Sequence, residues 1–545
     1  MSGTETSAVS RAEPTIAEIQ GRLGCPDGIG FSDVVRRMAR QPRERLALEY
    51  LESQLSYGEV LSAIGGLAKY LESKGVSRGS RVAYMFRGHP HALYALLAVT
   101  ISGAILCPMN HELKGEVLQR MLERYAIEFV IADEICFDEV RAAAITLSRP
   151  PLVLNGHSAE LKQAIKTGAD VNAYLGRPYP KPQDPGLILS TSGTTGLAKG
   201  VLIANTWGGA GAICAEKWDC FDAPPKEYVA LSWGYSGAIW QSTMAFMLGG
   251  SIVIPPRFSA SRLWEDFHSR GCTHIHLMGT MPRMLMAQPE KLTDKGSRKI
   301  IITSAGMPAD IWQDVERRFN ARIYECFSAV DSGGCWLAND GSSPPGSVGK
   351  PWVEMEGRVV DDKDNDVPMG EVGELVMRPK GGQAVVNYLG DPAASAEKTK
   401  GGWVHFGDYF RKDEKGDYWF VDRKRDLIRR RAMGIAPNEI EQIFRRFDRL
   451  LDIAVFAVPS ELGEDEIKIV VVPKPGSKLL PTDVAAFAQE SLARYMRPRY
   501  IEVADELPRT FGSARVQRFK LREQWANAAT WDAEAGHFLS QDRRS

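Results

Sequence analysis

A chain of 545 residues and 60.2 kDa is about three times the commonest domain size, so we expect several lobes rather than one core. Hydrophobic residues make up 44% and charged residues 25%, which excludes a collagen, a coiled coil and a disordered chain. The 67 Lys and Arg against 68 Asp and Glu give a formal charge of -1. This balance lacks the basic excess of most duplex-binding proteins, so no nucleic-acid partner is expected.

Several features bear on localisation and on metal content. The first residues are polar and contain no apolar stretch of a secretory signal, so we expect a cytoplasmic protein with reduced thiols. The eight cysteines include no CxxC pair and no nearby His at metal-ligand spacing, so a structural zinc site is not expected. The longest apolar run, residues 92–107, is too short to span a bilayer and predicts a buried helix followed by a buried strand.

Apolar runs of strand length alternate with helical periodicity over most of the chain, and glycines such as Gly79 and Gly103 mark the joins. This alternation predicts parallel strands connected by crossover helices, which is an α/β region. The expected strands are residues 81–86, 104–110, 129–133, 151–155, 187–190, 251–255, 274–278 and 299–304.

The pattern changes twice towards the C-terminus. After Gly346, short strands separated by Gly, Asp and Pro predict a β-rich lobe of hairpins. After Asp426, the pattern predicts a smaller mixed segment with helices at 437–446 and 482–492 and strands at 452–459, 466–473 and 500–503.

The most informative motif is LSTSGTTGLAKGV at residues 189–201, which places Ser, Thr, Gly and Lys199 directly after a predicted strand. Backbone N–H groups, hydroxyls and one mobile cation that meet in a single loop suit a polyphosphate. The loop is not a Walker A motif, because Lys199 is preceded by Ala198 and followed by Gly200 where that motif requires Gly and then Ser or Thr. A nucleotide site outside the P-loop class is therefore predicted.

This loop resembles the phosphate loop of the adenylate-forming superfamily, which contains acyl-CoA synthetases, peptide-synthetase adenylation domains and luciferases. Further segments resemble that family's motifs in order along the chain: LSYGEV, GVSRGSRVA, SAGMP, GSVGKP, VPMGEVGEL, GWVHFGDYF, DRKRDLI and VQRFKLRE. The resemblance implies an α/β fold with a large N-terminal region of two α/β subdomains plus a β-rich lobe, followed by a small mobile C-terminal α+β domain. It implies an adenylation domain at residues 1–424, a C-terminal domain at 426–545 and a hinge near Arg425.

The resemblance also implies ATP and Mg²⁺ as cofactors and assigns roles to individual residues. The β- and γ-phosphates would contact Thr191, Ser192, Gly193, Thr194, Thr195, Gly196 and Lys199. The adenine would lie against Gly306, Met307 and Pro308, with Phe327 and Ser328 beside the nucleotide. Asp408 would hold the ribose hydroxyls with Arg423 nearby, and Asp331 would bind Mg²⁺ as a hard oxygen donor.

Three positions in and around the nucleotide and acid sites depart from the family pattern. Val330 replaces a threonine that supplies a hydroxyl near the α-phosphate, and Trp233 replaces a histidine before the acid pocket, where Tyr235 follows. Trp233 and Tyr235 are therefore either acid-pocket residues or core aromatics. Arg515 stands at the position of the adenylating lysine in a segment that is one residue longer, and Lys520 is a less favoured substitute.

The loop after the hinge departs as well. Arg431, Ala432 and Gly434 occupy the expected passage for the pantetheine arm of coenzyme A, and the methyl group of Ala432 would narrow it. The basic run at residues 423–431 is either a solvated face or a site that attracts the phosphates of coenzyme A.

The resemblance predicts an AMP-forming ligase that adenylates a small or medium organic acid and transfers it to an acceptor, with coenzyme A as the leading acceptor. One alternative passes the adenylate to an amine, as an amide synthetase or a nitrite-activating diazotase. An alternative of another class is a nucleotide-binding pseudo-ligase without turnover. The expected partners are the small-molecule acid and the acceptor, and a homodimer is also possible.

Overall fold

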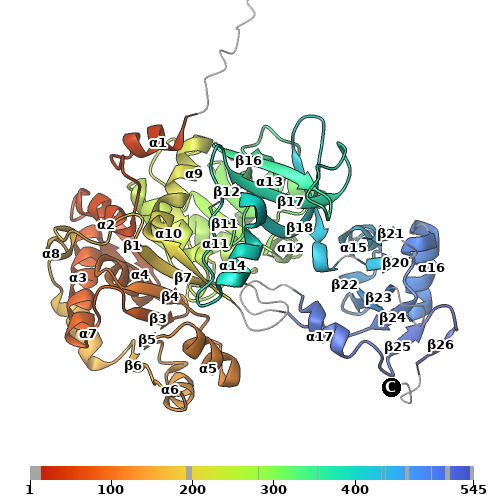
Figure 1. Cartoon of the computed structure of the whole chain (residues 1–545), viewed down its shortest axis with the longest axis horizontal. Helices are drawn as coiled ribbons and strands as arrows, with labels where there is room; N and C mark the ends of the chain where they lie inside the picture. Colours follow the sequence, from red (N-terminus) through yellow and green to blue (C-terminus); the bar gives the residue numbers. More distant parts are fainter. Residues whose placement is uncertain are drawn as a thin grey trace, which may run out of the picture.

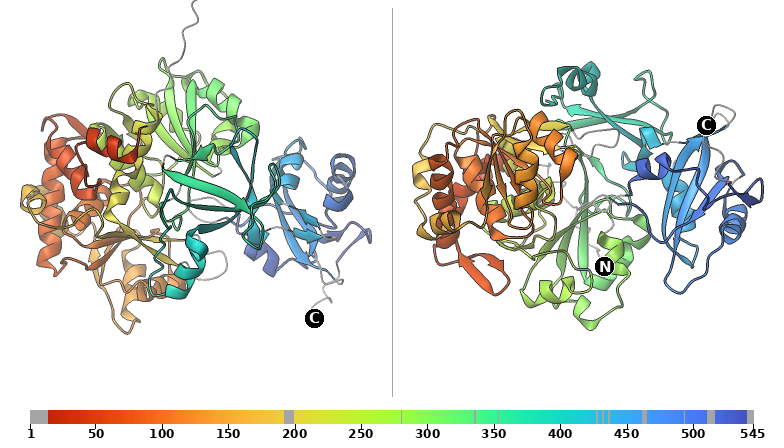
Figure 2. Two further views of the ribbon diagram at one scale, coloured as in Figure 1. Left: turned by 45° about the horizontal axis from the view of Figure 1, so that its top comes forward. Right: turned by 90° about the horizontal axis from the view of Figure 1, so that it is seen from below.

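The computed structural model describes residues 14–191, 199–279, 281–334, 336–352, 354–426, 428–430, 433–435, 437–460, 465–492, 494–509 and 516–539. A large body holds the elements up to β19, and the C-terminal elements lie to one side of it (Figure 1). Both views in Figure 2 show the same separation. Every helix among these residues is too short or too polar to span a bilayer.

The first α/β unit contains a six-stranded sheet in the order β6-β5-β3-β4-β7-β8, parallel except for β8. Its strands are β3 (Arg81–Met85), β4 (Ile105–Pro108), β5 (Phe129–Ala132), β6 (Leu152–Asn155), β7 (Pro185–Ser190) and β8 (Gly200–Ala204). Helix α3 (Tyr57–Ser73) precedes these strands, and the helices between them are α4 (Pro90–Ile101), α5 (Gly115–Arg124), α6 (Phe137–Ile145), α7 (Ala159–Thr167) and α8 (Asn172–Leu175). Helix α4 is buried along its whole length and leads into buried β4, which confirms the prediction for residues 92–107.

Small residues set the close packing of this unit. Helix α3 starts with a capping box, in which Ser56 and Glu59 each bond the other's backbone N–H. A side chain at Gly65 would overlap the carbonyl oxygen of Ala169, and one at Gly66 would overlap that of Ala164. Glycine at both positions therefore allows α3 to pack directly against α7 and the loop that follows it.

The second α/β unit contains a nine-stranded sheet in the order β15-β14-β13-β12-β11-β9-β10-β1-β2. Its strands are β1 (Leu46–Tyr50), β2 (Ser53–Ser56), β9 (Lys226–Tyr228), β10 (Ser251–Val253), β11 (His274–Met278), β12 (Ile300–Ala305), β13 (Ala321–Phe327), β14 (Leu337–Asn339) and β15 (Lys350–Pro351). Its helices are α1 (Ile16–Arg22), α2 (Phe31–Ala39), α9 (Ala210–Trp218), α10 (Ser236–Met247), α11 (Leu263–Ser269), α12 (Met281–Met286) and α13 (Trp312–Phe319). The strands from β1 to β13 are parallel in this sheet, whereas β2, β14 and β15 pair antiparallel at its two ends.

The β-rich lobe is an antiparallel sheet of four strands in chain order, as the hairpin pattern after Gly346 predicts. It consists of β16 (Met355–Val360), β17 (Gly373–Pro379), β18 (Val404–Lys412) and β19 (Tyr418–Arg423), with α14 (Pro392–Lys398) before β18. Short 3-10 turns complete the large body: η1 (Asn205–Gly209), η2 (Leu292–Asp294), η3 (Ala309–Ile311), η4 (Lys400–Gly402) and η5 (Lys424–Asp426).

The C-terminal elements form a hairpin, a five-stranded sheet and three helices. They are β20 (Ile428–Arg430), β21 (Met433–Ile435), α15 (Pro437–Phe444), β22 (Leu450–Pro459), β23 (Asp465–Pro473), α16 (Pro481–Ser491), η6 (Arg494–Met496), β24 (Tyr500–Val503), α17 (Arg518–Glu523), β25 (Thr530–Asp532) and β26 (His537–Phe538). Apolar residues of β22 to β24 bury both faces of the sheet, one of them against α15 and α16. The predicted fold class, two α/β units plus a β-rich lobe and a smaller α+β part, is confirmed.

Candidate active site

A large cleft runs between the N-terminal sheets, the β-rich lobe and the C-terminal elements. Several of its walls are formed by loops that follow parallel strands at their carboxyl ends, the edge where open α/β sheets bind ligands. Eleven predicted site residues line it: Thr191, Lys199, Tyr235, Gly306, Met307, Pro308, Phe327, Ser328, Asp331, Asp408 and Arg423. The fold thus brings motifs from distant parts of the chain to one place.

Other predicted residues lie outside the described residues. These are Ser192, Gly193, Thr194, Thr195, Gly196, Arg431, Ala432 and Arg515. The backbone of Arg425 lies in η5, and Gly434 in β21 pairs with Arg429 of β20. The roles assigned to these residues stay predictions.

The two ends of the phosphate loop are fixed by the antiparallel pair β7–β8. The N–H of Lys199 donates to the hydroxyl of Thr191 at 3.1 Å, and the N–H of Thr191 donates to the carbonyl of Lys199 at 2.9 Å. The ammonium of Lys199 is 3.5 Å from Asp391 and 4.8 Å from the centre of the Tyr388 ring. The lysine is therefore held over the cleft by a carboxylate and an aromatic face, two partners that the sequence did not indicate.

Asp331 lies next to this lysine and shares Tyr388 with it. Its Oδ2 accepts a hydrogen bond from the Tyr388 hydroxyl at 2.5 Å and lies 3.2 Å from the ammonium of Lys398 on α14. Mg²⁺ is usually held by one or two carboxylates together with substrate phosphates, so a carboxylate beside the phosphate loop fits such an ion. Lys398 neutralises that carboxylate in the present arrangement.

The predicted adenine loop rests on a buried carboxylate. Glu325 on β13 accepts hydrogen bonds from the N–H groups of Gly306 at 2.5 Å and Met307 at 3.1 Å. Gly306 has a φ of +94°, a conformation that favours glycine, so the loop turns sharply at this point. Burial raises the pKa of Glu325 to about 7, although both backbone hydrogen bonds oppose the rise. Glu325 was not predicted from the sequence, where its signal is a glutamate inside the apolar segment ARIYECF.

The predicted ribose site follows from the register of two neighbouring strands. Asp408 of β18 pairs directly with Arg423 of β19, and the Nε of Arg423 is 3.0 Å from Oδ1 of Asp408. The Asp408 side chain is only 3% exposed, so its carboxylate is held rigidly at the edge of the cleft. A carboxylate in this position can accept hydrogen bonds from vicinal hydroxyls.

The two aromatic residues of the predicted acid pocket are separated by the fold. Trp233 is buried in the core, where its carbonyl accepts a hydrogen bond from the hydroxyl of Tyr84 at 2.8 Å, and it does not line the cleft. Tyr235 is 39% exposed and lines the cleft directly before α10. Two residues apart in the sequence, they face different environments because a turn at residues 232–235 separates them.

A buried polar chain reaches the same part of the cleft from the nine-stranded sheet. The Glu227 carboxylate bonds Nδ1 of His274 and the side-chain amide of Gln241. The hydroxyl of Thr303 lies 3.0 Å from Nε2 of His274 and 2.8 Å from Nδ1 of His276. His276 lines the cleft, and burial lowers its pKa to about 3, so the ring is neutral.

Three of the six cations in the basic run at residues 423–431 have described side chains, and each of these three pairs with an acidic partner. Lys424 contacts Glu374 at 3.0 Å and Asp362 at 2.9 Å, while Arg423 pairs with Asp408. Arg430 is buried, bonds Glu466 at 2.8 Å and donates to the carbonyl of Arg497. These three residues therefore form neither a solvated face nor a free cationic site for the phosphates of coenzyme A, because each one pairs within the fold.

Two motifs meet at the predicted hinge. Arg522 of α17 bonds Asp426 of η5 at 2.9 Å, and Arg518 bonds Glu441 of α15 at 2.6 Å. The Asp422 carboxylate accepts from the N–H of Asn438 at 2.9 Å, and burial raises its pKa to about 6 although the nearby Arg518 opposes this. The segment VQRFKLRE is therefore connected to the segment DRKRDLI by ion pairs.

Comparisons with known proteins identify the same two regions. The family model for AMP-binding enzymes matches residues 34–386, and the model for the AMP-binding enzyme C-terminal domain matches residues 439–511. A sulfoacetate–CoA ligase of Cupriavidus necator is 26% identical over 476 residues, which cover 86% of this chain and 92% of that protein. An indoleacetate–CoA ligase of Aromatoleum aromaticum is 28% identical over 500 residues, which cover 88% and 95%.

Solved structures share the fold. The ATP-bound MatB of Rhodopseudomonas palustris matches with a TM-score of 0.80 at 22% identity, over 91% of this chain and 99% of that one. A benzoate CoA ligase from Burkholderia xenovorans matches with a TM-score of 0.76 at 20% identity, over 91% and 100%. These likenesses extend through the N-terminal sheets, the β-rich lobe and the C-terminal elements alike.

Proposed function

Because this chain belongs to the family of AMP-binding enzymes and is an AMP-forming acid ligase of the acyl-CoA synthetase type, we propose that it activates an organic acid with Mg·ATP and transfers the acyl group to coenzyme A. The observation that carries this proposal is the meeting of Lys199, the Gly306–Pro308 loop and the Asp408–Arg423 pair in one cleft. The cytoplasm, which supplies ATP and coenzyme A, is the proposed compartment.

In the first half-reaction, a carboxylate oxygen of the acid attacks the α-phosphorus of ATP. The bond between the α-phosphorus and the bridging oxygen breaks, and pyrophosphate leaves with the negative charge. Lys199 stabilises charge on the leaving phosphates, and its contacts with Asp391 and Tyr388 hold it in place beforehand. Loop residues 192–198 complete the phosphate site in this proposal.

Asp331 would hold Mg²⁺, which neutralises charge on the phosphates when it is bound. Tyr388 fixes the orientation of this carboxylate through its hydroxyl, and burial, together with the nearby Asp331, raises the pKa of Tyr388, so the phenol remains a donor. Lys398 balances the charge of Asp331 until Mg·ATP is present.

The nucleoside would be held at two points. Asp408 would accept hydrogen bonds from the ribose hydroxyls, with Arg423 fixing its orientation. The adenine would lie on the loop at Gly306, which Glu325 supports from below through two backbone N–H groups. Sites built on strand ends in this way are rigid before the ligand arrives.

The acid would occupy the part of the cleft lined by Tyr235, Trp240 and His276. The Nδ1 of His276 is engaged by Thr303, which leaves Nε2 as the ring nitrogen for a polar group of the acid. We therefore expect acids that carry a hydrogen-bonding substituent besides the carboxylate to be preferred.

In the second half-reaction, the thiol of coenzyme A attacks the acyl carbonyl and AMP leaves. We propose that residues 426–545 rotate relative to residues 1–424 about Arg425 between the two halves, and that the arm of coenzyme A passes Arg431, Ala432 and Gly434. Two contacts flank this position: Asp426 pairs with Arg522 within the rotating part, and the N–H of Asn438 donates to Asp422 across Arg425. Both named relatives are CoA ligases, which favours a thiol over an amine as the acceptor.

The test is a panel of acids incubated with Mg·ATP, with and without coenzyme A, while pyrophosphate, AMP and thioester are measured. The panel includes sulfoacetate, indoleacetate and benzoate and their hydroxylated or aminated analogues. The expected result is acid-dependent pyrophosphate release and a thioester by mass spectrometry, both lost in Lys199→Ala. A nucleotide product other than AMP, or AMP released only when an amine is added, would contradict the proposal.

A further inference from the structure

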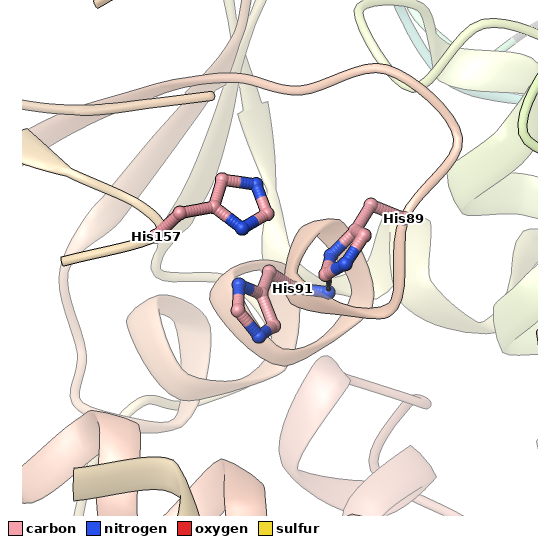
Figure 3. Close-up of side chains that lie close together, drawn as sticks. All are labelled: His89, His91 and His157. Atoms are coloured by element: carbon pink, nitrogen blue, oxygen red, sulfur yellow. Dashed lines mark hydrogen bonds between the residues drawn. The ribbon is translucent and has the colours of Figure 1, made fainter. Parts of the chain in front are cut away.

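Three histidines from separate loops converge at the carboxyl edge of the six-stranded sheet. His89 and His91 follow β3 at the start of α4, and His157 follows β6 before α7. Asp133 directly follows β5, which lies between β3 and β6 in the sheet order. Figure 3 shows the three imidazole rings around one common space.

This place is the topological switch point of the sheet. The connection from β3 leads to β4 on one side, whereas the connection from β5 leads to β6 on the other side. The loops therefore diverge between β3 and β5 at the strand ends, the edge where open α/β sheets place ligands. Among the described residues, neither the three histidines nor Asp133 lines the nucleotide cleft, so the site is separate from it.

The distances suit a shared ligand. One ring nitrogen of each histidine lies within 4.8 Å of one ring nitrogen of the other two. The ring centres are 4.3 Å apart for His89 and His91, 4.7 Å for His89 and His157, and 5.0 Å for His91 and His157. Three ligand nitrogens on a tetrahedral zinc ion are about 3.3 Å apart, so small side-chain rotations would close the site.

Hydrogen bonds of the histidines leave suitable lone pairs. The Nδ1 of His91 lies 2.8 Å from the carbonyl of Gly156, which can only accept, so Nδ1 carries the proton and Nε2 keeps its lone pair. A backbone carbonyl that orients an imidazole in this way is typical behind metal-binding histidines. The Nδ1 of His89 accepts from the N–H of His91 at 3.1 Å, a single cap contact that a metal ion would replace.

Two further atoms at the site have only long contacts. Nε2 of His157 and Oδ2 of Asp133 are buried without a hydrogen-bond partner among the described residues. Each still has an ion-pair neighbour, since Nε2 of His157 lies 3.7 Å from Oδ1 of Asp133, and Nε of Arg87 lies 3.4 Å from Oδ2 of Asp133. Because these distances exceed those of a direct hydrogen bond, both atoms keep the capacity to contact a further ligand.

We propose that His89, His91 and His157 bind a divalent transition-metal ion, with zinc as the best fit, and that the Asp133 carboxylate supplies its counter-charge. Neutral imidazoles suit zinc, copper and nickel, and zinc binds three histidines with a fourth position left for water or another ligand. The ion connects the loops after β3 and β6 and stabilises this edge of the sheet.

The experiment uses the full chain after treatment with a chelator and dialysis. Zn²⁺ alone is titrated by calorimetry, bound metal is counted by elemental analysis, and Co²⁺ replaces zinc so that the ligand set appears in the absorption spectrum. The expected result is one ion per chain, an imidazole-ligated tetrahedral Co²⁺ spectrum and a higher midpoint of thermal unfolding with metal than without it.

His91→Ala and His157→Asn should each weaken Zn²⁺ binding at least about 100-fold and abolish the thermal shift. His268→Ala is the matched control, because His268 is equally half-buried but lies in the other α/β unit, and it should bind zinc like the parent. Acid-dependent pyrophosphate release without added zinc should be the same in the parent and in His157→Asn. This separates a failure of the metal proposal from a failure of the proposed ligase activity.

Three results would overturn the proposal. They are the absence of a stoichiometric ion on the parent, Zn²⁺ binding by both histidine variants that is as tight as that of the parent, and a Co²⁺ spectrum with thiolate charge-transfer bands. If a histidine variant does not fold, the Co²⁺ spectrum of the parent decides on its own. Imidazole bands support the site, and thiolate bands or no bands refute it.

Discussion

Glu325 gives the sharpest prediction about this fold, because one buried carboxylate supports the predicted adenine loop. It is 2% exposed and accepts from the N–H groups of Gly306 and Met307. In Glu325→Gln the amide oxygen can accept from one N–H, but the amide nitrogen faces the other donor. The substitution also removes an ionisable group whose pKa burial raises from 4.5 to about 7.

The magnitude follows from linkage between protonation and folding. A carboxyl with a higher pKa in the folded chain binds protons more tightly there, so its stabilising contribution is complete below pH 4.5 and is lost as pH rises through about 7. The shift corresponds to about 3 kcal/mol. Glu325→Gln cannot ionise, so the free energy of unfolding of the parent should fall relative to that of this variant by about 3 kcal/mol from pH 4.5 to about pH 8.

Urea unfolding at a series of pH values, followed by tryptophan fluorescence, measures this difference. The exposed Glu290→Gln is the control and should follow the parent at every pH. In parallel, the KM for ATP at pH 8 should rise about tenfold in Glu325→Gln, the cost of one lost hydrogen bond to a charged acceptor. If the free energy of unfolding changes with pH in the same way for the parent and for Glu325→Gln, the reasoning is refuted.

The remaining predictions concern the two half-reactions. Lys199→Ala should lower acid-dependent exchange of pyrophosphate into ATP by about 100-fold or more, because a cation at the leaving phosphates is lost; unchanged exchange would contradict its role. Arg515→Ala should lower the same exchange by roughly 100-fold to 1,000-fold with ATP binding retained, and Arg515→Lys should keep part of the rate. If Lys520→Ala abolishes this exchange and Arg515→Ala does not, then Lys520 is the adenylating cation. Asp408→Asn should raise the KM for ATP about tenfold with little change in the KM for the acid. His276→Phe should lower kcat/KM at least about tenfold for acids with a polar substituent and spare unsubstituted ones; equal losses for both would contradict its contact with the acid.

Contiguous motifs account for what could be predicted from the sequence. The loop around Lys199 and the strands that carry Asp408 and Arg423 are each readable from a short segment, and strand pairing then brings the last two side chains together. Alternating apolar runs likewise predicted both parallel sheets, although β1, β9 and β13 were missed. Strand β9 has only three residues and is defined by its pairing with β10 and β11 rather than by a distinct local pattern.

Residues whose roles depend on contacts between distant elements could not be predicted from the sequence. Tyr388 and Lys398 contact Asp331 only because the segment before β18 folds back over the cleft, and Glu325 meets Gly306 only because β12 and β13 are neighbours. Cysteine spacing alone gave no zinc site, and the proposed site of His89, His91 and His157 has no compact sequence signature. Their meeting depends on the order of β3, β5 and β6, which strand prediction does not give.

Charge and residue type alone did not predict which side chains are buried. Arg430 carries a charge in a basic run but is buried against Glu466, and Trp233 stands beside a pocket residue in the sequence but packs in the core. In both cases the side-chain environment is set by contacts between distant segments.

The central claim, that the acid is activated as an adenylate, is tested most directly with an acid labelled with oxygen-18 in its carboxylate. Attack on the α-phosphorus followed by displacement by the thiol leaves one carboxylate oxygen on the phosphate of AMP. Mass spectrometry of the products should therefore show AMP that carries one label, together with a thioester that retains the other. Unlabelled AMP, or ADP together with labelled inorganic phosphate, would contradict the account.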